Sequence, residues 1–179
     1  MSYRFSTRLL PIVVLALTFL LTGCPNLGSF TFTEESPEQT VSGSPLVGLA
    51  NLFPASIPLE IDLEQELQEQ DASGARSVHL IELYFELTDD TEEENFDFLD
   101  NIELEVSSAD SNSDLPRRDL AWRNPVPTGE NRFEFDIDED VDLKPYAEEG
   151  LRLRTTASGS APNNDAKFRV VATFRVHIL

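Results

Sequence analysis

Cysteine, histidine and basic residues are scarce in this 179-residue sequence, and each scarcity excludes something. The single cysteine, Cys24, rules out an intramolecular disulfide, and with two histidines a closed zinc site would need carboxylates to complete it. Only 13 Lys and Arg residues accompany 33 Asp and Glu residues, which gives a formal net charge of -20. Nucleic acid and anionic lipid surfaces are therefore poor partners.

Catalytic and phosphate-binding motifs are also missing. The eight glycines are scattered, and none opens a helix as a phosphate-binding loop requires. No Gly-x-Ser-x-Gly segment is present to carry a serine nucleophile. Carboxylates are so numerous that a pair at the separation used by glycosidases would carry no information. The sequence thus favours a protein that is not an enzyme and needs no cofactor.

Long apolar runs are absent except near the amino terminus. Residues 9–21 are apolar apart from Thr18, and they follow a segment that contains Arg4 and Arg8 but no acid. As a helix, such a run would reach about 20 Å, well short of the roughly 30 Å hydrocarbon core of a bilayer. We therefore interpret residues 1–23 as an export signal rather than a membrane-spanning helix.

The run ends in Leu21, Thr22, Gly23 and Cys24, a segment that resembles the lipobox of bacterial lipoproteins. The resemblance implies that a diacylglycerol is attached to the sulfur of Cys24 and that a signal peptidase cuts between Gly23 and Cys24. Two or three acyl chains on one residue anchor a water-soluble domain stably. Pro25, where an aspartate would signal inner-membrane retention, implies an outer-membrane position facing the periplasm. The alternative is an ordinary secreted protein in which Cys24 is a free thiol.

The rest of the chain is expected to form a tether and one domain. Residues 24–44 are rich in Gly, Ser, Thr and Pro, which predicts a flexible tether behind the lipidated cysteine. Phe30 and Phe32 alternate there and leave open a first edge strand. Residues 45–179 are expected to form one acidic domain, large enough to be stabilised by a hydrophobic core.

Apolar residues in this domain mostly recur at every second position, the period of a half-buried strand. Short helical turns are expected at residues 64–70 and 142–149, and Phe96, Phe98 and Leu99 are expected to form a turn against the core. No long amphipathic helix is predicted, which favours an all-β fold: an antiparallel β-sandwich, immunoglobulin-like or jelly-roll, of six to seven strands. The predicted strands lie within residues 57–63, 78–87, 102–106, 115–122, 133–137, 151–155 and 168–178.

Several segments resemble a group of bacterial lipoproteins and secreted domains of uncharacterised function. They are residues 95–99 (Asn-Phe-Asp-Phe-Leu), residues 142–146 (Asp-Leu-Lys-Pro-Tyr), and Ser158-Gly159 with Pro162 before the last apolar strand. The resemblance covers most of the folded part. It implies the fold and no established activity.

Charge is divided unevenly along the domain. Residues 60–114 hold 19 acids and one base, Arg76, whereas residues 150–179 hold one acid and five bases. We expect the two segments to meet, because opposite charges facing across strands stabilise a sheet. The alternative is a docking patch for an acidic partner or a polysaccharide. The five bases are Arg152, Arg154, Lys167, Arg169 and Arg175.

Other candidate sites each have a plainer interpretation. Four alternate aspartates suggest calcium, but Val141 and Ala147 stand where an EF-hand needs glycine and glutamate, so a solvated strand face is favoured over a weak structural ion. The aspartates are Asp136, Asp138, Asp140 and Asp142, and the loop acids Asp89, Asp90, Glu92, Glu93 and Glu94 are interpreted in the same way. His79 and His177 are expected to be sheet histidines rather than ligands. Trp122 could stack on a sugar ring, although a core or rim position is favoured.

Three functions are compatible with the sequence. We favour a structural or interaction module of the cell envelope that is bound to the membrane through a lipid on Cys24. Its possible partner is an envelope protein or a glycan. A lipoprotein that binds a glycan or a small apolar molecule is the alternative. A carboxylate-dependent hydrolase comes last, since it would need two carboxylates of clearly divergent pKa.

Overall fold

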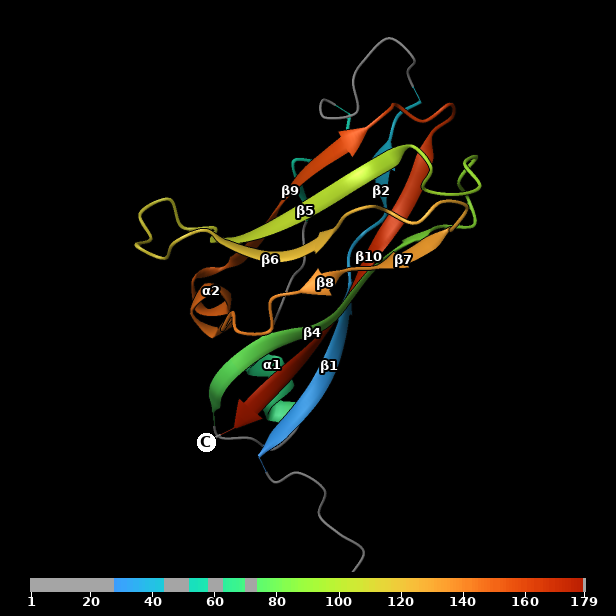
Figure 1. Ribbon diagram of the computed structural model, residues 1–179. Helices are drawn as coiled ribbons and strands as arrows, with labels where there is room; N and C mark the ends of the chain where they lie inside the picture. Colours follow the sequence, from blue (N-terminus) through green and yellow to red (C-terminus); the bar gives the residue numbers. More distant parts are fainter. Residues whose placement is uncertain (1–27, 44–51, 58–62, 70–73, 179) are drawn as a thin grey trace, which may run out of the picture.

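The computed structural model describes residues 28–43, 52–57, 63–69 and 74–178 (Figure 1). The predicted signal segment, Gly23 and Cys24 lie outside these residues. The described residues form ten strands and two short helices. They are β1 (Ser29–Glu35), β2 (Gln39–Val41), β3 (Ser56–Ile57), α1 (Leu63–Glu69), β4 (Ala75–Leu87), β5 (Leu99–Ser108), β6 (Arg118–Arg123), β7 (Arg132–Glu134), β8 (Asp136–Ile137), α2 (Lys144–Glu149), β9 (Leu151–Gly159) and β10 (Ala166–Ile178).

The strands form two antiparallel sheets of five strands that pack face to face, which confirms the predicted β-sandwich. Sheet 1 has the order β1-β10-β4-β7, with β2 also paired to β10, and sheet 2 has the order β3-β9-β5-β6-β8. The helical turns expected at residues 64–70 and 142–149 are α1 and α2. Of the strand predicted at residues 57–63, the structure describes Ile57, in β3, whereas residues 58–62 lie outside the described part.

Phenylalanine rings fill the space between the sheets. Phe85 on β4 is fully buried, and its ring centroid lies 4.9 Å from that of Phe135 and 5.1 Å from that of Phe168 on β10. Phe96, in the expected turn before β5, is also fully buried and meets the ring of Phe133 edge-on at 4.9 Å. Each ring buried in this way contributes about 1.5–3 kcal/mol. The pairing of the strands and the packing of the aromatic rings therefore support the same arrangement, two sheets packed face to face.

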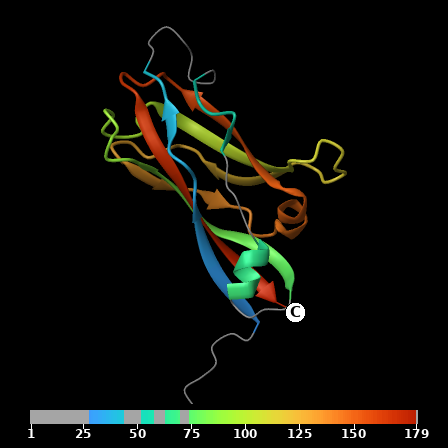
Figure 2. The same cartoon turned by 180° about the vertical axis from the view of Figure 1, so that it is seen from behind.

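Sheet 1 is longer than sheet 2. The views in Figures 1 and 2 show the ends of β1, β4 and β10 extending beyond sheet 2, with α1 lying against them. Leu67 of α1 packs there against the hydrophobic core. The alternation of β4 changes phase along this length, because a β-bulge between Leu80 and Glu82 adds one residue opposite β10. His79 therefore does not share a face with Leu83 and Phe85, although an uninterrupted alternation over the predicted strand 78–87 would place all three on one face.

The prediction of a flexible tether over residues 24–44 is wrong for residues 28–43. Seven residues of β1 pair with β10, and Phe32 is 9% exposed, with its ring stacked on that of Phe174 at 5.2 Å. Ser36 is buried where the chain leaves β1, and its hydroxyl accepts a hydrogen bond from the Val170 amide at 3.0 Å. The Phe30-Phe32 alternation was thus the edge-strand signal, and the polar composition around it was misleading.

The single strand predicted at residues 133–137 is also wrong, because the chain changes sheets at Phe135. β7 pairs with β4 in sheet 1, whereas β8 pairs with β6 in sheet 2. The Phe135 amide donates to the Leu83 carbonyl at 3.0 Å, and the Asp138 amide donates to the Leu120 carbonyl at 2.9 Å. This crossing joins the two sheets at one edge. It also adds to the strand count beyond the expected six to seven.

Candidate functional site

The outer face of sheet 2 carries the main candidate site. In the order β9-β5-β6, the strand register places Thr156, Glu103 and Trp122 in one row. Residues that alternate with these, such as Leu104 and Ala121, are buried against the core, so the row faces outward. Trp122 is 40% exposed, and among the described residues it is the large hydrophobic side chain that stays exposed. A flat, solvent-facing indole is available for stacking.

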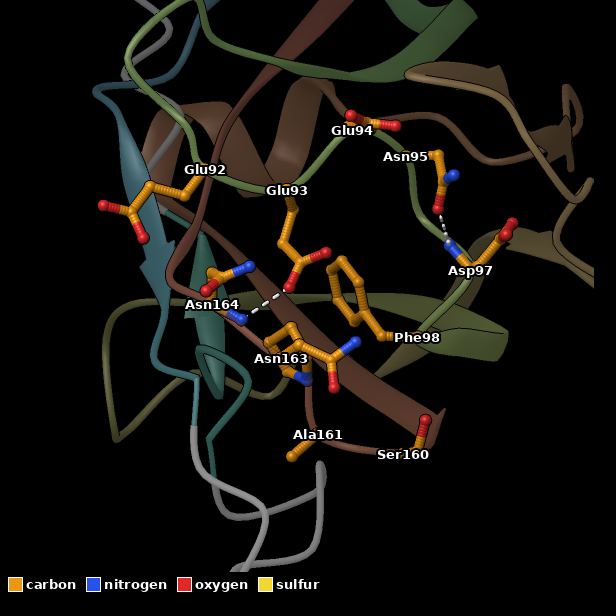
Figure 3. Close-up of a pocket in the computed structure, with 11 residues that line it drawn as sticks. Glu92, Glu93, Glu94, Asn95, Asp97, Phe98, Ser160, Ala161, Asn163 and Asn164 are labelled. Carbon is orange, nitrogen blue, oxygen red and sulfur yellow. Dashed lines mark hydrogen bonds between the residues drawn. The ribbon is translucent and has the colours of Figure 1, made fainter.

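An open cleft of about 450 Å³ lies elsewhere, between two loops at one end of the sandwich. It is lined by residues 92–95, 97, 98 and 160–164, and Figure 3 shows how these side chains lie. The Glu93 carboxylate accepts a hydrogen bond from the Asn164 amide at 2.6 Å, and the Asn95 side chain accepts one from the Asp97 amide at 3.0 Å (Figure 3). These polar groups therefore brace the loops rather than converge on an empty point.

A second cleft, of about 350 Å³, lies beside the β5–β6 loop and the start of β9. We call it the arginine cleft, because Arg117, Arg152 and Arg154 line it. Asp110 is the acid in its lining, and one oxygen of that carboxylate accepts a hydrogen bond from the Asn112 amide at 2.9 Å. The remaining lining residues are Ser107, Ser108, Ala109, Ser111, Ser113 and Leu115.

The predicted pairing between residues 60–114 and residues 150–179 holds for Arg169 of β10, which meets Glu86. Lys167 and Arg169 also pair with acids that lie outside residues 60–114. Lys167 lies 3.7 Å from Glu38, and Arg169 lies 3.5 Å from Glu35 on β1 and 3.2 Å from Glu86 on β4. The hydrogen bond to the Glu86 carboxylate, followed by the charge of Glu35, raises the pKa of Arg169 above its ordinary value. Two acidic strands are thus held to the basic strand between them.

The pairing prediction fails for Lys167, whose partner Glu38 lies outside residues 60–114, and for the three remaining bases. Within the described part of the chain, Arg152, Arg154 and Arg175 form no ion pair. Arg154 stands directly opposite Glu105 in the β5–β9 register, yet the two charged groups are not within 4.0 Å. Its side chain lines the arginine cleft instead. The sequence singled out Arg152 and Arg154 but not Arg117. The feature that could have indicated Arg117 is its position after a serine-rich loop.

The four alternate aspartates do not form a common site. One oxygen of Asp142 accepts hydrogen bonds from the amides of Val78 and Lys144, both at 3.0 Å, and thereby ties the start of α2 to β4. Asp138 accepts from the Asp140 amide at 3.1 Å, and Asp136 lies 3.8 Å from Arg123. Across residues 28–43, 52–57, 63–69 and 74–178, no three His, Cys, Asp or Glu side chains are arranged to hold a metal ion.

Both histidines lie on strands of sheet 1, as expected. Their rings meet edge-on at 5.8 Å, and Nδ1 of His79 lies 2.9 Å from the carbonyl oxygen of Glu139. His177 is exposed on β10. The pair sits at the end of sheet 1 where β1 begins, because Ser29 is the register partner of His177.

Comparison with known proteins adds no assignment: no protein-family model matches the chain, and no curated protein matches it. In the part of the chain that the structure describes, no helix is long and apolar enough to cross a membrane.

Proposed function

We propose that the protein is a lipoprotein of the cell envelope, anchored through acyl chains on Cys24, with its β-sandwich acting as an interaction module. The observation that carries this proposal is the segment Leu21-Thr22-Gly23-Cys24 at the end of a short apolar run preceded by basic residues. An outer-membrane position facing the periplasm belongs to the same proposal and is supported by Pro25. Two acyl chains would hold an acidic, water-soluble domain at a bilayer.

The early start of the fold bears on how the module would be presented. β1 begins at Ser29, five residues after Cys24, and five extended residues span at most about 18 Å. A lipidated Cys24 would therefore keep the end of sheet 1 close to the membrane surface. The outer face of sheet 2 runs along the side of the molecule and would stay accessible to partners in the aqueous phase (Figure 1).

A non-catalytic role is supported by how the acidic groups are used. Carboxylates in the Figure 3 cleft and in residues 136–142 accept hydrogen bonds from backbone amides, which is a structural use. Phe85, Phe96 and Phe168 fill the space between the sheets and are fully buried, which argues against an apolar ligand there. A hydrolase and an apolar-ligand carrier are accordingly less favoured.

Glycan binding is the second candidate, and the exposure of Trp122 favours it. Because the chain contains one tryptophan, its fluorescence reports on this position alone. Titration with soluble N-acetylglucosamine oligosaccharides should shift the emission to the blue and saturate. Trp122→Ala should abolish retention of the protein in gels that contain the same glycan, and Trp122→Phe should preserve part of it. Unchanged emission together with unchanged retention would exclude glycan binding at the outer face of sheet 2.

The anchor is tested by Cys24→Ser, with Thr22→Ser as the matched control because it keeps a small residue in the lipobox. We expect the wild-type protein and the control to be processed and recovered in the detergent-soluble membrane fraction. Cys24→Ser should leave the precursor uncleaved. If Cys24→Ser changed neither processing nor fractionation, the proposed anchor would be wrong.

A further inference from the structure

We propose that the arginine cleft binds a phosphate group carried by a ligand in the aqueous phase. This inference goes beyond the proposed function, since it concerns Arg117, Arg152 and Arg154 on the folded domain. Anion binding by the cleft does not depend on lipidation, whereas the preference for a soluble ligand over a lipid headgroup rests on the proposed anchor. It assigns a ligand chemistry to a cleft of the described domain that is lined by three arginines and one acid, Asp110, and in which none of the arginines forms an ion pair with a described residue.

The first support is electrostatic. In a chain with 33 acids and 13 bases, an arginine has many possible partners, and Lys167 and Arg169 find theirs. Arg152 and Arg154 do not, even though Glu105 faces Arg154 across the strands. Like charges that share a small volume repel one another, and a bound anion would relieve that repulsion. The cleft is therefore complementary to an anion.

The second support is the chemistry of the donors. Guanidinium groups present paired N–H donors that match the oxygens of phosphate, and serine hydroxyls can add single donors. Ser108 and Ser113 accept hydrogen bonds from the amides of Asp110 and Leu115, which braces the loop that forms one wall. With Asp110 in the lining, the three arginines leave a net charge of about +2. A phosphate monoester carries about 1.5–2 negative charges at pH 7, against one for a carboxylate, so it neutralises more of that charge.

Size and position favour a soluble ligand. The cleft volume of about 350 Å³ lies near the lower end of the roughly 300–1,000 Å³ typical of small-molecule sites, enough for a phosphate and a sugar-sized group. The β5–β6 loop projects from the side of the molecule, away from the end at which β1 begins, in both views (Figures 1 and 2). A headgroup in the protein's own membrane would be expected at that other end.

The test is isothermal titration of the processed protein with inorganic pyrophosphate in a zwitterionic detergent. We expect saturable binding, and at least tenfold weaker binding of acetate. Arg152→Ala and Arg154→Ala should each weaken pyrophosphate binding about tenfold, the usual effect of losing a charge-assisted hydrogen bond. Arg175→Ala is the matched control, because Arg175 is exposed and unpaired in the described structure but lies on sheet 1, and it should change the affinity less than twofold.

Three results would overturn the proposal. The first is an absence of saturable binding to the wild-type protein, and the second is equal weakening by Arg175→Ala. The third is binding to phosphatidylglycerol vesicles without binding to pyrophosphate, which would move the ligand to the bilayer. If an alanine variant melts at a lower temperature, Arg152→Lys provides the same test, since lysine keeps the positive charge but lacks the paired N–H donors of the guanidinium group. It should bind severalfold more weakly, and wild-type affinity would contradict guanidinium recognition.

Discussion

Replacing Phe32 by alanine distinguishes a strand at residues 29–35 from a tether. Phe32 is 9% exposed and stacks on Phe174 of the central strand β10. Buried Phe→Ala substitutions cost about 3–5 kcal/mol, and an edge-strand position favours the lower end, about 3 kcal/mol. This is a large share of the roughly 5–15 kcal/mol that stabilises an ordinary domain. For a chain of this size the melting temperature should fall by about 6–12 °C.

The measurement is urea denaturation followed by far-ultraviolet circular dichroism, with thermal unfolding as a second readout. Thr31→Ala is the control, since Thr31 is exposed in the same strand and its replacement should change stability by less than about 0.5 kcal/mol. The midpoint for Phe32→Ala should fall with an unchanged slope. If both variants unfolded like the wild-type protein, β1 would contribute nothing to the fold and the strand assignment would be refuted.

Two further predictions concern backbone space and pH. Gly159 has φ +145°, and a Cβ there would collide with the Phe98 carbonyl oxygen. Gly159→Ala should therefore lower the free energy of unfolding by at least about 2 kcal/mol. Gly28→Ala is the control: a Cβ at Gly28 meets open space, so this variant should melt like the wild-type protein. Burial, followed by the nearby charge of Glu66, raises the pKa of Glu34 above its ordinary value of 4.5. The folded state therefore holds that proton more tightly than the unfolded chain does, and this contribution to stability is lost as the pH rises from 4.5 through the raised pKa. Glu34→Gln should therefore be more stable than the wild-type protein at pH 7, and the difference should vanish below about pH 4 in urea titrations; a constant difference across this range would contradict the assignment.

The fold class was predictable from the sequence because most strands bury one face. Alternation at residues 102–106 and 168–178 identifies β5 and β10 directly. What alternation does not specify is where a strand changes phase or partner. The bulge beside Ile81 and the change of sheets at Phe135 depend on register with distant strands, and no local signal marks either one.

The candidate site was less predictable for the same reason. Five bases near the carboxyl terminus look equivalent in the sequence, but strand order decides which of them meet an acid. Arg169 lies on β10, between acidic β1 and β4, whereas Arg152 lies opposite Ser107 on β5. The exposure of Trp122 likewise follows from its outward position on β6, which the sequence alone leaves open.

Intact-mass analysis of the protein extracted from membranes tests the central proposal most directly. The account predicts a chain that begins at Cys24 and carries the added mass of a diacylglyceryl group, with or without a further acyl chain. A chain with an unmodified Cys24 thiol, or one that begins at another residue, would contradict it.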